Sequence, residues 1–171
     1  SKSVAKEFIS QLTGVPNETI EVIEGDLIKN EHSQRASDQD LSELLKVDLE
    51  KFYEGNLVEK KESLSSFLHY REINIEDITA ATDLSKKLHQ ALIDFKPLGL
   101  LLNETMEKAE DLNDLRKLIF PEANTIDGNT ALTVLITLAT NAKENEAEPG
   151  LLSSRVHLFL RGLPGLWICL N

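Results

Sequence analysis

The chain has 171 residues, a size that fits one domain with room for a small second lobe and that needs no disulfide or metal to fold. Its formal net charge of −11 argues against a free-standing nucleic-acid-binding domain, because such domains are usually basic. A single cysteine excludes an internal disulfide and fits a reducing, cytoplasmic setting, and no apolar run is long enough to span a membrane.

The first segment predicts a helix followed by a strand. Apolar side chains recur there at helical spacing, at Val4, Phe8, Ile9 and Leu12. Gly14 suits the position just past the end of that helix. Ile20 and Val22 then alternate with glutamates up to Gly25, which indicates a short strand with one buried face. Such an αβ unit normally belongs to a larger sheet, and the residues that follow offer no partner strands.

The middle of the chain predicts a bundle of amphipathic helices. Residues 29–39 have no periodicity and indicate an exposed linker. Ser37 and Asp40 are expected to cap a helix that continues to Phe52. A second helix follows Gly55-Asn56, and a third is expected to end at Pro97. Further helices are expected before Pro121 and over 132–139, with Thr133, Thr137 and Asn141 on the polar face of the latter, and residues 143–150 indicate a loop.

The last stretch, 151–171, carries two arginines and no carboxylate. Alternation from 155 to 161 predicts a strand, and the turn at 162–165 predicts a hairpin with the partner strand LWICL. Val156, Leu158 and Leu160 would face inward, and the other face would carry Arg155, His157, Phe159 and Arg161. Cations beside an aromatic ring can grip a nucleic-acid strand through phosphate contact and base stacking. The alternative is a strand whose arginines pair with nearby acids.

Other constellations indicate no catalytic centre. Phosphate-binding loops of the Gly-Lys-Ser/Thr type, dinucleotide fingerprints and His-Glu-x-x-His are absent from the sequence. The four histidines are widely separated, which favours surface positions over a shared metal site. The acidic cluster of Glu107, Glu110, Asp111 and Asp114 lacks the spacing of a calcium loop and indicates a solvated helix face. Cys169 lacks the further cysteines that a structural zinc site needs.

Both ends of the chain resemble parts of one enzyme family. AKEFISQLTGVPNETIEVIEG resembles the segment downstream of the Ser-Ala-Thr motif in the first RecA-like domain of DEAD/DEAH-box superfamily 2 helicases. RVHLFLRGLPGLWICLN resembles a stretch of a bacterial branch of these helicases, Arg-x-His-x-Phe-x-Arg-Gly followed by Gly-Leu-Trp-x-Cys. In that branch the cysteine begins a zinc-binding cluster. The two matches cover under a quarter of the chain, and the helical middle has no recognisable motif.

The resemblance implies an internal piece of a longer helicase. Residues 1–28 would be the edge of the first RecA-like domain, 29–39 a linker, 40–150 a helical insertion domain, and 151–171 a basic hairpin leading to a zinc module. The piece would contact or steer nucleic acid, DNA in preference to RNA, beside the flanking RecA-like domains. It would have no ATPase activity of its own, because ATP, Mg²⁺ and Zn²⁺ would be cofactors of the complete protein, with Cys169 as one zinc ligand.

We therefore expect a predominantly α fold (α+β): a multi-helix bundle with a short αβ unit at the N-terminus and a β-hairpin at the C-terminus. The expected role is an accessory region of an ATP-dependent nucleic-acid helicase. The alternative is a self-standing acidic all-α module that binds a basic or apolar protein partner, which the net charge of −11 would suit.

Overall fold

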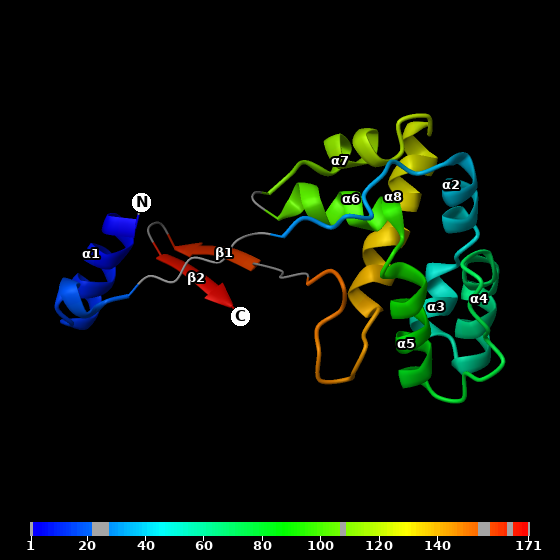
Figure 1. Cartoon of the computed structure of the whole chain (residues 1–171), viewed down its shortest axis with the longest axis horizontal. Coiled ribbons are helices and arrows are strands. Elements are labelled where there is room, and N and C mark those ends of the chain that lie inside the picture. Colours follow the sequence, from blue (N-terminus) through cyan, green and yellow to red (C-terminus); the bar gives the residue numbers. More distant parts are fainter. Residues whose placement is uncertain (1, 22–27, 107–108, 154–157, 164–165, 171) are drawn as a thin grey trace.

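The fold is predominantly α, as expected. The computed structural model describes residues 2–21, 28–106 and 109–153, together with the backbone of 158–163 and 166–170. The elements among these residues are α1 (Lys2–Thr13), the 3-10 helix η1 (Asn17–Thr19), α2 (Asp38–Leu45), α3 (Leu49–Glu54), α4 (Leu57–Tyr70), α5 (Ala81–Leu92), α6 (Lys96–Thr105), α7 (Leu112–Ile119), α8 (Thr125–Asn141), β1 (Leu158–Leu163) and β2 (Leu166–Leu170). Helices α2 to α8 form a helical body, and α1 and the two strands lie outside it (Figure 1).

Helix α8 is the centre of the helical body, since α2, α5 and α7 all pack against it. A helix covered on several sides must be apolar on more than one face. The side chains of Val134, Leu135 and Leu138 are accordingly all buried. Thr137 was expected on a polar face and is also buried, so the expected two-sided pattern is wrong at this position. The core residues of the other helices are mostly leucine, with Phe67 and Phe95 in edge-to-face contact at 5.6 Å between ring centroids.

The capping signal at Ser37 is confirmed, but the helix that it begins is shorter than expected. The backbone N–H of Asp40 donates to Ser37 Oγ at 3.1 Å, and that of Ser37 donates to Asp40 Oδ2 at 2.7 Å. The helix ends at Leu45, and α3 begins separately at Leu49. Asp48 accounts for the break, because its carboxylate accepts from the backbone N–H of Lys51 at 3.1 Å and caps a new helix.

Pro97 was expected to end a helix and instead lies in the first turn of one. Helix α5 ends at Leu92, and α6 begins at Lys96 with the proline at its start. The first backbone N–H groups of any helix lack an intrahelical acceptor, so a residue without an N–H loses nothing there. The turn between α5 and α6 is closed by the N–H of Phe95 donating to the carbonyl of Leu92 at 3.0 Å.

Residues 29–39 were expected to be an exposed linker. Of these, 38 and 39 belong to α2, and residues 28–36, here called the extended segment, precede that helix. The residues of the extended segment form no helix or strand, but hydrogen bonds attach them to the helical body. The backbone N–H of Asn30 donates to Asn103 Oδ1 at 2.7 Å, and Asn103 Nδ2 donates to the Asn30 carbonyl at 3.0 Å. Further along, the N–H of Gln34 donates to the carbonyl of Lys96 at 3.2 Å. The segment therefore holds a defined path across α6.

Of the expected N-terminal helix and strand, the helix is observed. It ends before Gly14, whose φ of +72° is the left-handed conformation that glycine favours. Ile20 and Glu21 lie in no strand, and residues 22–27, which carry the rest of the expected strand, lie outside the described residues. Val4, Phe8 and Leu12 on α1 are exposed by 64%, 64% and 73%. The apolar face of α1 is thus left uncovered by the described part of the chain.

Candidate nucleic-acid interface

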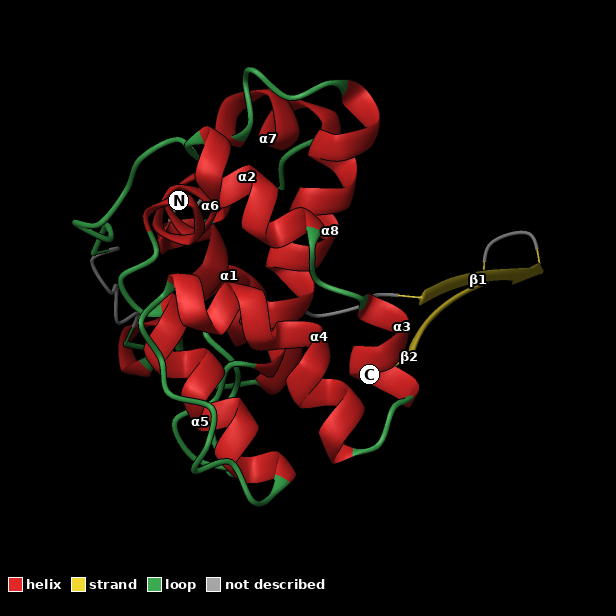
Figure 2. Cartoon of the chain, turned by 90° about the vertical axis from the view of Figure 1, so that its right-hand side faces the viewer, coloured by secondary structure: helices red, strands yellow, loops and turns green. Residues whose placement is uncertain are grey.

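Residues 151–171, assigned from the sequence to a basic hairpin, contain the strands β1 and β2. These strands pair antiparallel, with Leu158 opposite Leu170, Phe159 opposite Cys169 and Leu160 opposite Ile168. A register shift follows between Leu160 and Leu163, and it includes Arg161. Such a shift marks an irregularity of the pleat. Figure 2 shows the pair projecting away from the helical body.

The predicted contact residues are only partly within the described chain. The backbone of Phe159 and Arg161 belongs to β1, and that of Cys169 belongs to β2. Arg155 and His157 lie outside the described residues. A common face for these four residues and a metal-binding role for Cys169 both stay predictions. The regular register covers Leu158–Leu160 only, and the shift that follows it includes Arg161.

The described residues contain no group of three or more histidine, cysteine, aspartate or glutamate side chains that could hold a metal ion. His32, His69 and His89 belong to the extended segment, α4 and α5 respectively.

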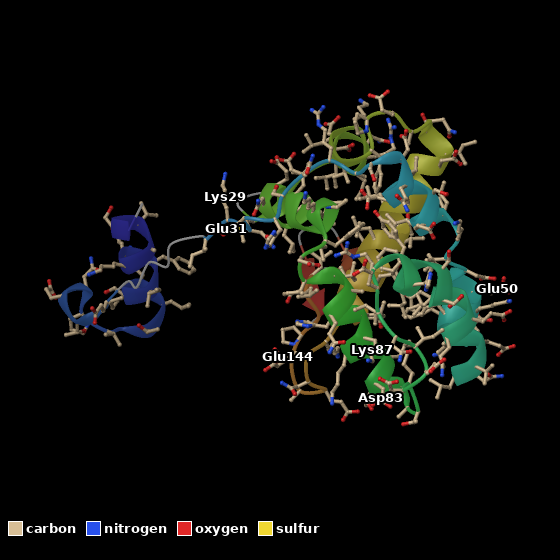
Figure 3. The ribbon with its side chains drawn as sticks, turned by 45° about the vertical axis from the view of Figure 1, so that its right-hand side comes forward. Lys29, Glu31, Glu50, Asp83, Lys87 and Glu144 are labelled. Atoms are coloured by element: carbon tan, nitrogen blue, oxygen red, sulfur yellow. The ribbon has the colours of Figure 1, made fainter. Side chains whose placement is uncertain are left out.

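Two members of the acidic cluster at the start of α7 make contacts within the helix: one caps it and the other forms an ion pair on its surface. The Asp111 carboxylate accepts from the backbone N–H of Asn113 at 2.8 Å, which caps α7. Asp114 forms a surface ion pair with Lys117 at 3.5 Å. Glu107 lies outside the described residues. Glu50 and Glu144 lie on the outside of the helical body (Figure 3). The expected solvated helix face is observed at Asp114, which is exposed on α7; Asp111 is exposed but precedes the helix, and Glu110 is half-buried outside it.

Several basic side chains of the helical body are neutralised by neighbouring acids. Lys46 Nζ lies 2.7 Å from Glu43 Oε1, and Ser66 Oγ donates to Glu43 Oε2 at 2.6 Å. These two hydrogen bonds lower the pKa of Glu43 below its usual range, and the bond from Lys46 has the larger effect. Lys51 and Lys87 likewise pair with Glu62 and Asp77. Each of these lysines therefore has a carboxylate partner on the surface.

A cleft lies where the extended segment crosses the first turn of α6, and its lining contains four basic side chains and two aspartates. This basic cleft has a volume of about 410 Å³ and is lined by residues of the extended segment, by the C-terminal end of α4 and by the turn between α5 and α6. Its ionisable residues include His32, Arg35, Arg71 and Lys96. No pattern in the sequence indicated this cluster, because its members are far apart in the chain and follow no common spacing.

Two residues at the end of α4 form the wall of the basic cleft. The hydroxyl of Tyr70 donates to Asp40 Oδ1 at 2.8 Å; burial of the phenol and then this hydrogen bond raise the pKa of Tyr70. Arg71 Nε donates to the carbonyl of Ala91 at 2.9 Å, and Nη2 lies 2.5 Å from Asp94 Oδ1. The Arg71 guanidinium also lies 5.2 Å from the centroid of the Phe95 ring. These contacts fix the side chain in one position.

Comparison with known proteins gives one distant likeness. The chain is 27% identical over 174 residues to Druantia protein DruE of Escherichia coli (strain UMEA 4076-1). The alignment covers 97% of this chain and 9% of that protein, so the chain spans about 9% of the relative's length. No family model matches the chain, and no solved structure matches it. The likeness therefore runs through the helical body, where the sequence held no recognisable motif.

Within the described part of the chain, every helix is too short or too polar to cross a lipid bilayer.

Proposed function

We propose that this chain is an accessory region of an ATP-dependent nucleic-acid helicase and that its C-terminal hairpin contacts the nucleic-acid strand. The observation that carries the proposal is the antiparallel pairing of β1 with β2 outside the helical body, which sets Phe159 of the first stretch opposite Cys169 of the second. A projecting hairpin with cations and an aromatic ring can reach a strand that the acidic body would repel.

The proposal gives the helical body a non-catalytic role. The body is built around one continuous apolar core. Under this proposal nucleotide hydrolysis belongs to motor domains elsewhere in a longer polypeptide, which would supply the ATP and Mg²⁺ sites. The alignment with a protein of which this chain spans only 9% supports a place within a larger polypeptide.

The uncovered face of α1 supports a contact with one of those motor domains. Phe8 and Leu12 are exposed by 64% and 73%, and a row of large apolar side chains in water marks a surface that another structure covers. The first RecA-like domain of the same polypeptide is the proposed occupant. Under this proposal α1 completes that domain, and the extended segment connects it to the helical body.

Binding of single-stranded nucleic acid tests the proposal. The chain is titrated into labelled oligothymidine and oligouridine over a series of salt concentrations, followed by fluorescence anisotropy. Arg155→Ala with Arg161→Ala should weaken binding and lower the slope of log K against log salt by about two, because each phosphate contact releases about one counterion.

The matched control removes the same charge from the helical body, with Lys51→Ala and Lys117→Ala. Both lysines are exposed and already paired with carboxylates. The control should bind as the unchanged chain does. Equal losses in both double variants would mean that net charge alone drives binding, and unchanged binding after loss of the two arginines would remove the hairpin from the interface.

The second candidate is an acidic protein-interaction module, favoured by the net charge of −11 and by the same exposed face of α1. This module would bind no oligonucleotide at low salt. It would instead bind a basic or apolar protein partner, and Phe8→Ser with Leu12→Ser would abolish that binding.

A further inference from the structure

The basic cleft has more positive than negative side chains on a chain with a net charge of −11. It is lined by two carboxylates, Asp40 and Asp94, against three side chains that are always cationic at neutral pH and one histidine. An excess of positive charge in a concave site concentrates anions there, because low-dielectric walls focus the field.

Both carboxylates of the cleft are already engaged. Asp40 accepts hydrogen bonds from Tyr70 and from the backbone and hydroxyl of Ser37, at 2.7 to 2.8 Å. Asp94 pairs with Arg71 at 2.5 Å. By contrast, no carboxylate of the described residues lies within ion-pairing distance of Arg35 or Lys96, and Lys96 Nζ donates only to the neutral Gln34 amide oxygen at 3.2 Å. The charge left over in the cleft is therefore positive.

The two unpaired cations stand on backbone that is fixed in place. Arg35 lies between Gln34, whose N–H donates to the Lys96 carbonyl at 3.2 Å, and Ala36, whose N–H donates to the Ile119 carbonyl at 2.9 Å. Lys96 begins α6, whose first turn contains no acidic residue. A ligand would thus meet cations whose backbone is already ordered, which reduces the entropy lost on binding.

Arg71 adds a third cation with a fixed orientation. Its Nε and Nη2 are occupied by the Ala91 carbonyl and by Asp94, and the Phe95 ring lies 5.2 Å from the guanidinium. These contacts use one edge of the guanidinium fork, so Nη1 has no hydrogen-bond partner among the described residues and can donate to a ligand. Guanidinium and ammonium donors together match the several oxygens of a phosphate group.

From this arrangement we propose that the basic cleft binds a phosphate group, with Arg35 and Lys96 as direct contacts and Arg71 in the wall. The identity of the ligand rests on the proposed function. If that function holds, the phosphate is a phosphodiester of the same nucleic-acid strand that the hairpin contacts. The strand would then touch the helical body as well as the hairpin, and the cleft would steer its path.

The first test uses inorganic phosphate, and it is independent of the proposed function. Amide NMR spectra of the whole chain are recorded during a titration with phosphate, with chloride at equal ionic strength as the reference. Shifts should concentrate at the amides of residues 34–36, 96, 98 and 99 and should disappear after Arg35→Ala with Lys96→Ala. The control pair Lys51→Ala with Lys117→Ala should keep them. Shifts scattered over the surface, or equal in both double variants, would overturn the phosphate site.

The second test uses labelled oligothymidine with the same variants. The proposal expects the Arg35→Ala, Lys96→Ala chain to lose about tenfold in affinity and about two in salt slope. Arg35→Lys with Lys96→Arg should restore most of the binding. Loss in the hairpin variants but not in these would overturn the phosphodiester assignment and leave the proposed function standing. Phosphate shifts at the cleft in a chain that binds no oligonucleotide would keep the phosphate site and reject the proposed function.

Discussion

Asn30 and Asn103, which are 73 residues apart in the chain, are joined by two hydrogen bonds of 2.7 and 3.0 Å. The side chain of Asn103 satisfies both the N–H and the carbonyl of Asn30, as a partner strand would. Asn103→Ala should remove both bonds and lower the free energy of unfolding by about 1–2 kcal/mol. Urea unfolding followed by circular dichroism measures this, with Asn113→Ala, an exposed asparagine on α7, as the control. Equal effects in the two variants would show that the two hydrogen bonds between Asn30 and Asn103 contribute no stability.

Gly99 lets the extended segment approach α6 closely. A Cβ atom at this position would lie 1.8 Å from the carbonyl oxygen of His32, which is a backbone atom that cannot turn aside. Gly99→Ala should therefore destabilise the chain by about 1–3 kcal/mol, although alanine normally favours a helix over glycine by about 1 kcal/mol. It should also weaken phosphate binding, since Arg35 would move with the segment. A thermal melt that shows stabilisation would contradict this close contact.

Arg116 is a buried cation whose guanidinium is not fully hydrogen-bonded. The residue is 8% exposed, and its Nε is buried without a hydrogen-bond partner. Replacing an unpaired buried polar group by an apolar one of similar shape is often neutral or stabilising. Arg116→Met should thus leave the free energy of unfolding unchanged or raise it by about 1 kcal/mol.

Arg116→Ala separates charge from packing at this position. The stem carbons Cγ and Cδ of Arg116 lie 3.0 Å from the position that a Cβ on Gly128 would take, so they pack directly against α8. Loss of this stem should destabilise the chain by about 1–2 kcal/mol. If Met and Ala destabilised the chain equally in urea unfolding, the guanidinium itself would be the stabilising group.

Asp83 gives the fold a dependence on acid pH. Its carboxylate accepts from the N–H and hydroxyl of Thr79 and from the N–H of Ala80, each at 2.9 Å, and these bonds lower its pKa, those of Thr79 most. The Asp83 carboxyl group therefore binds a proton less tightly in the folded state than in the unfolded state. The resulting stabilisation is complete above the unfolded pKa of about 3.9 and is lost as the pH falls through the folded pKa.

Asp83→Asn tests this dependence, because the amide does not titrate. Unfolding in urea at about pH 6 and about pH 3 should show a larger loss of stability on acidification in the unchanged chain than in the variant. The Thr79 and Ala80 donors remain in place in both. Identical losses would mean that other carboxylates account for all of the acid sensitivity.

Local signals in the sequence predicted the helical elements better than their connections. Ser37 and Asp40 form the capping box that their spacing indicated, because a cap depends only on residues within one turn. Pro97 gave the wrong boundary, since a proline can either follow one helix or begin the next. The close approach that makes Gly99 necessary depends on the tertiary structure and leaves no local trace.

The two candidate sites also differ in how far the sequence could predict them. The pattern from Arg155 to Arg161 is contiguous, so alternation alone suggested a contact surface. The basic cleft unites Arg35, Arg71 and Lys96 from three separate parts of the chain, and only the folded path of the extended segment assembles it. No spacing rule on a single sequence would have selected these residues.

Photo-crosslinking tests the central claim most directly. The chain is irradiated with an oligonucleotide that contains 4-thiothymidine, and the crosslinked peptides are mapped by mass spectrometry. Our account predicts crosslinks within residues 155–161, lost with rising salt, and few or none on the acidic surface of α3 and the start of α4. Crosslinks spread along those helices, with none in residues 155–161, would contradict the assignment of the hairpin as the nucleic-acid contact.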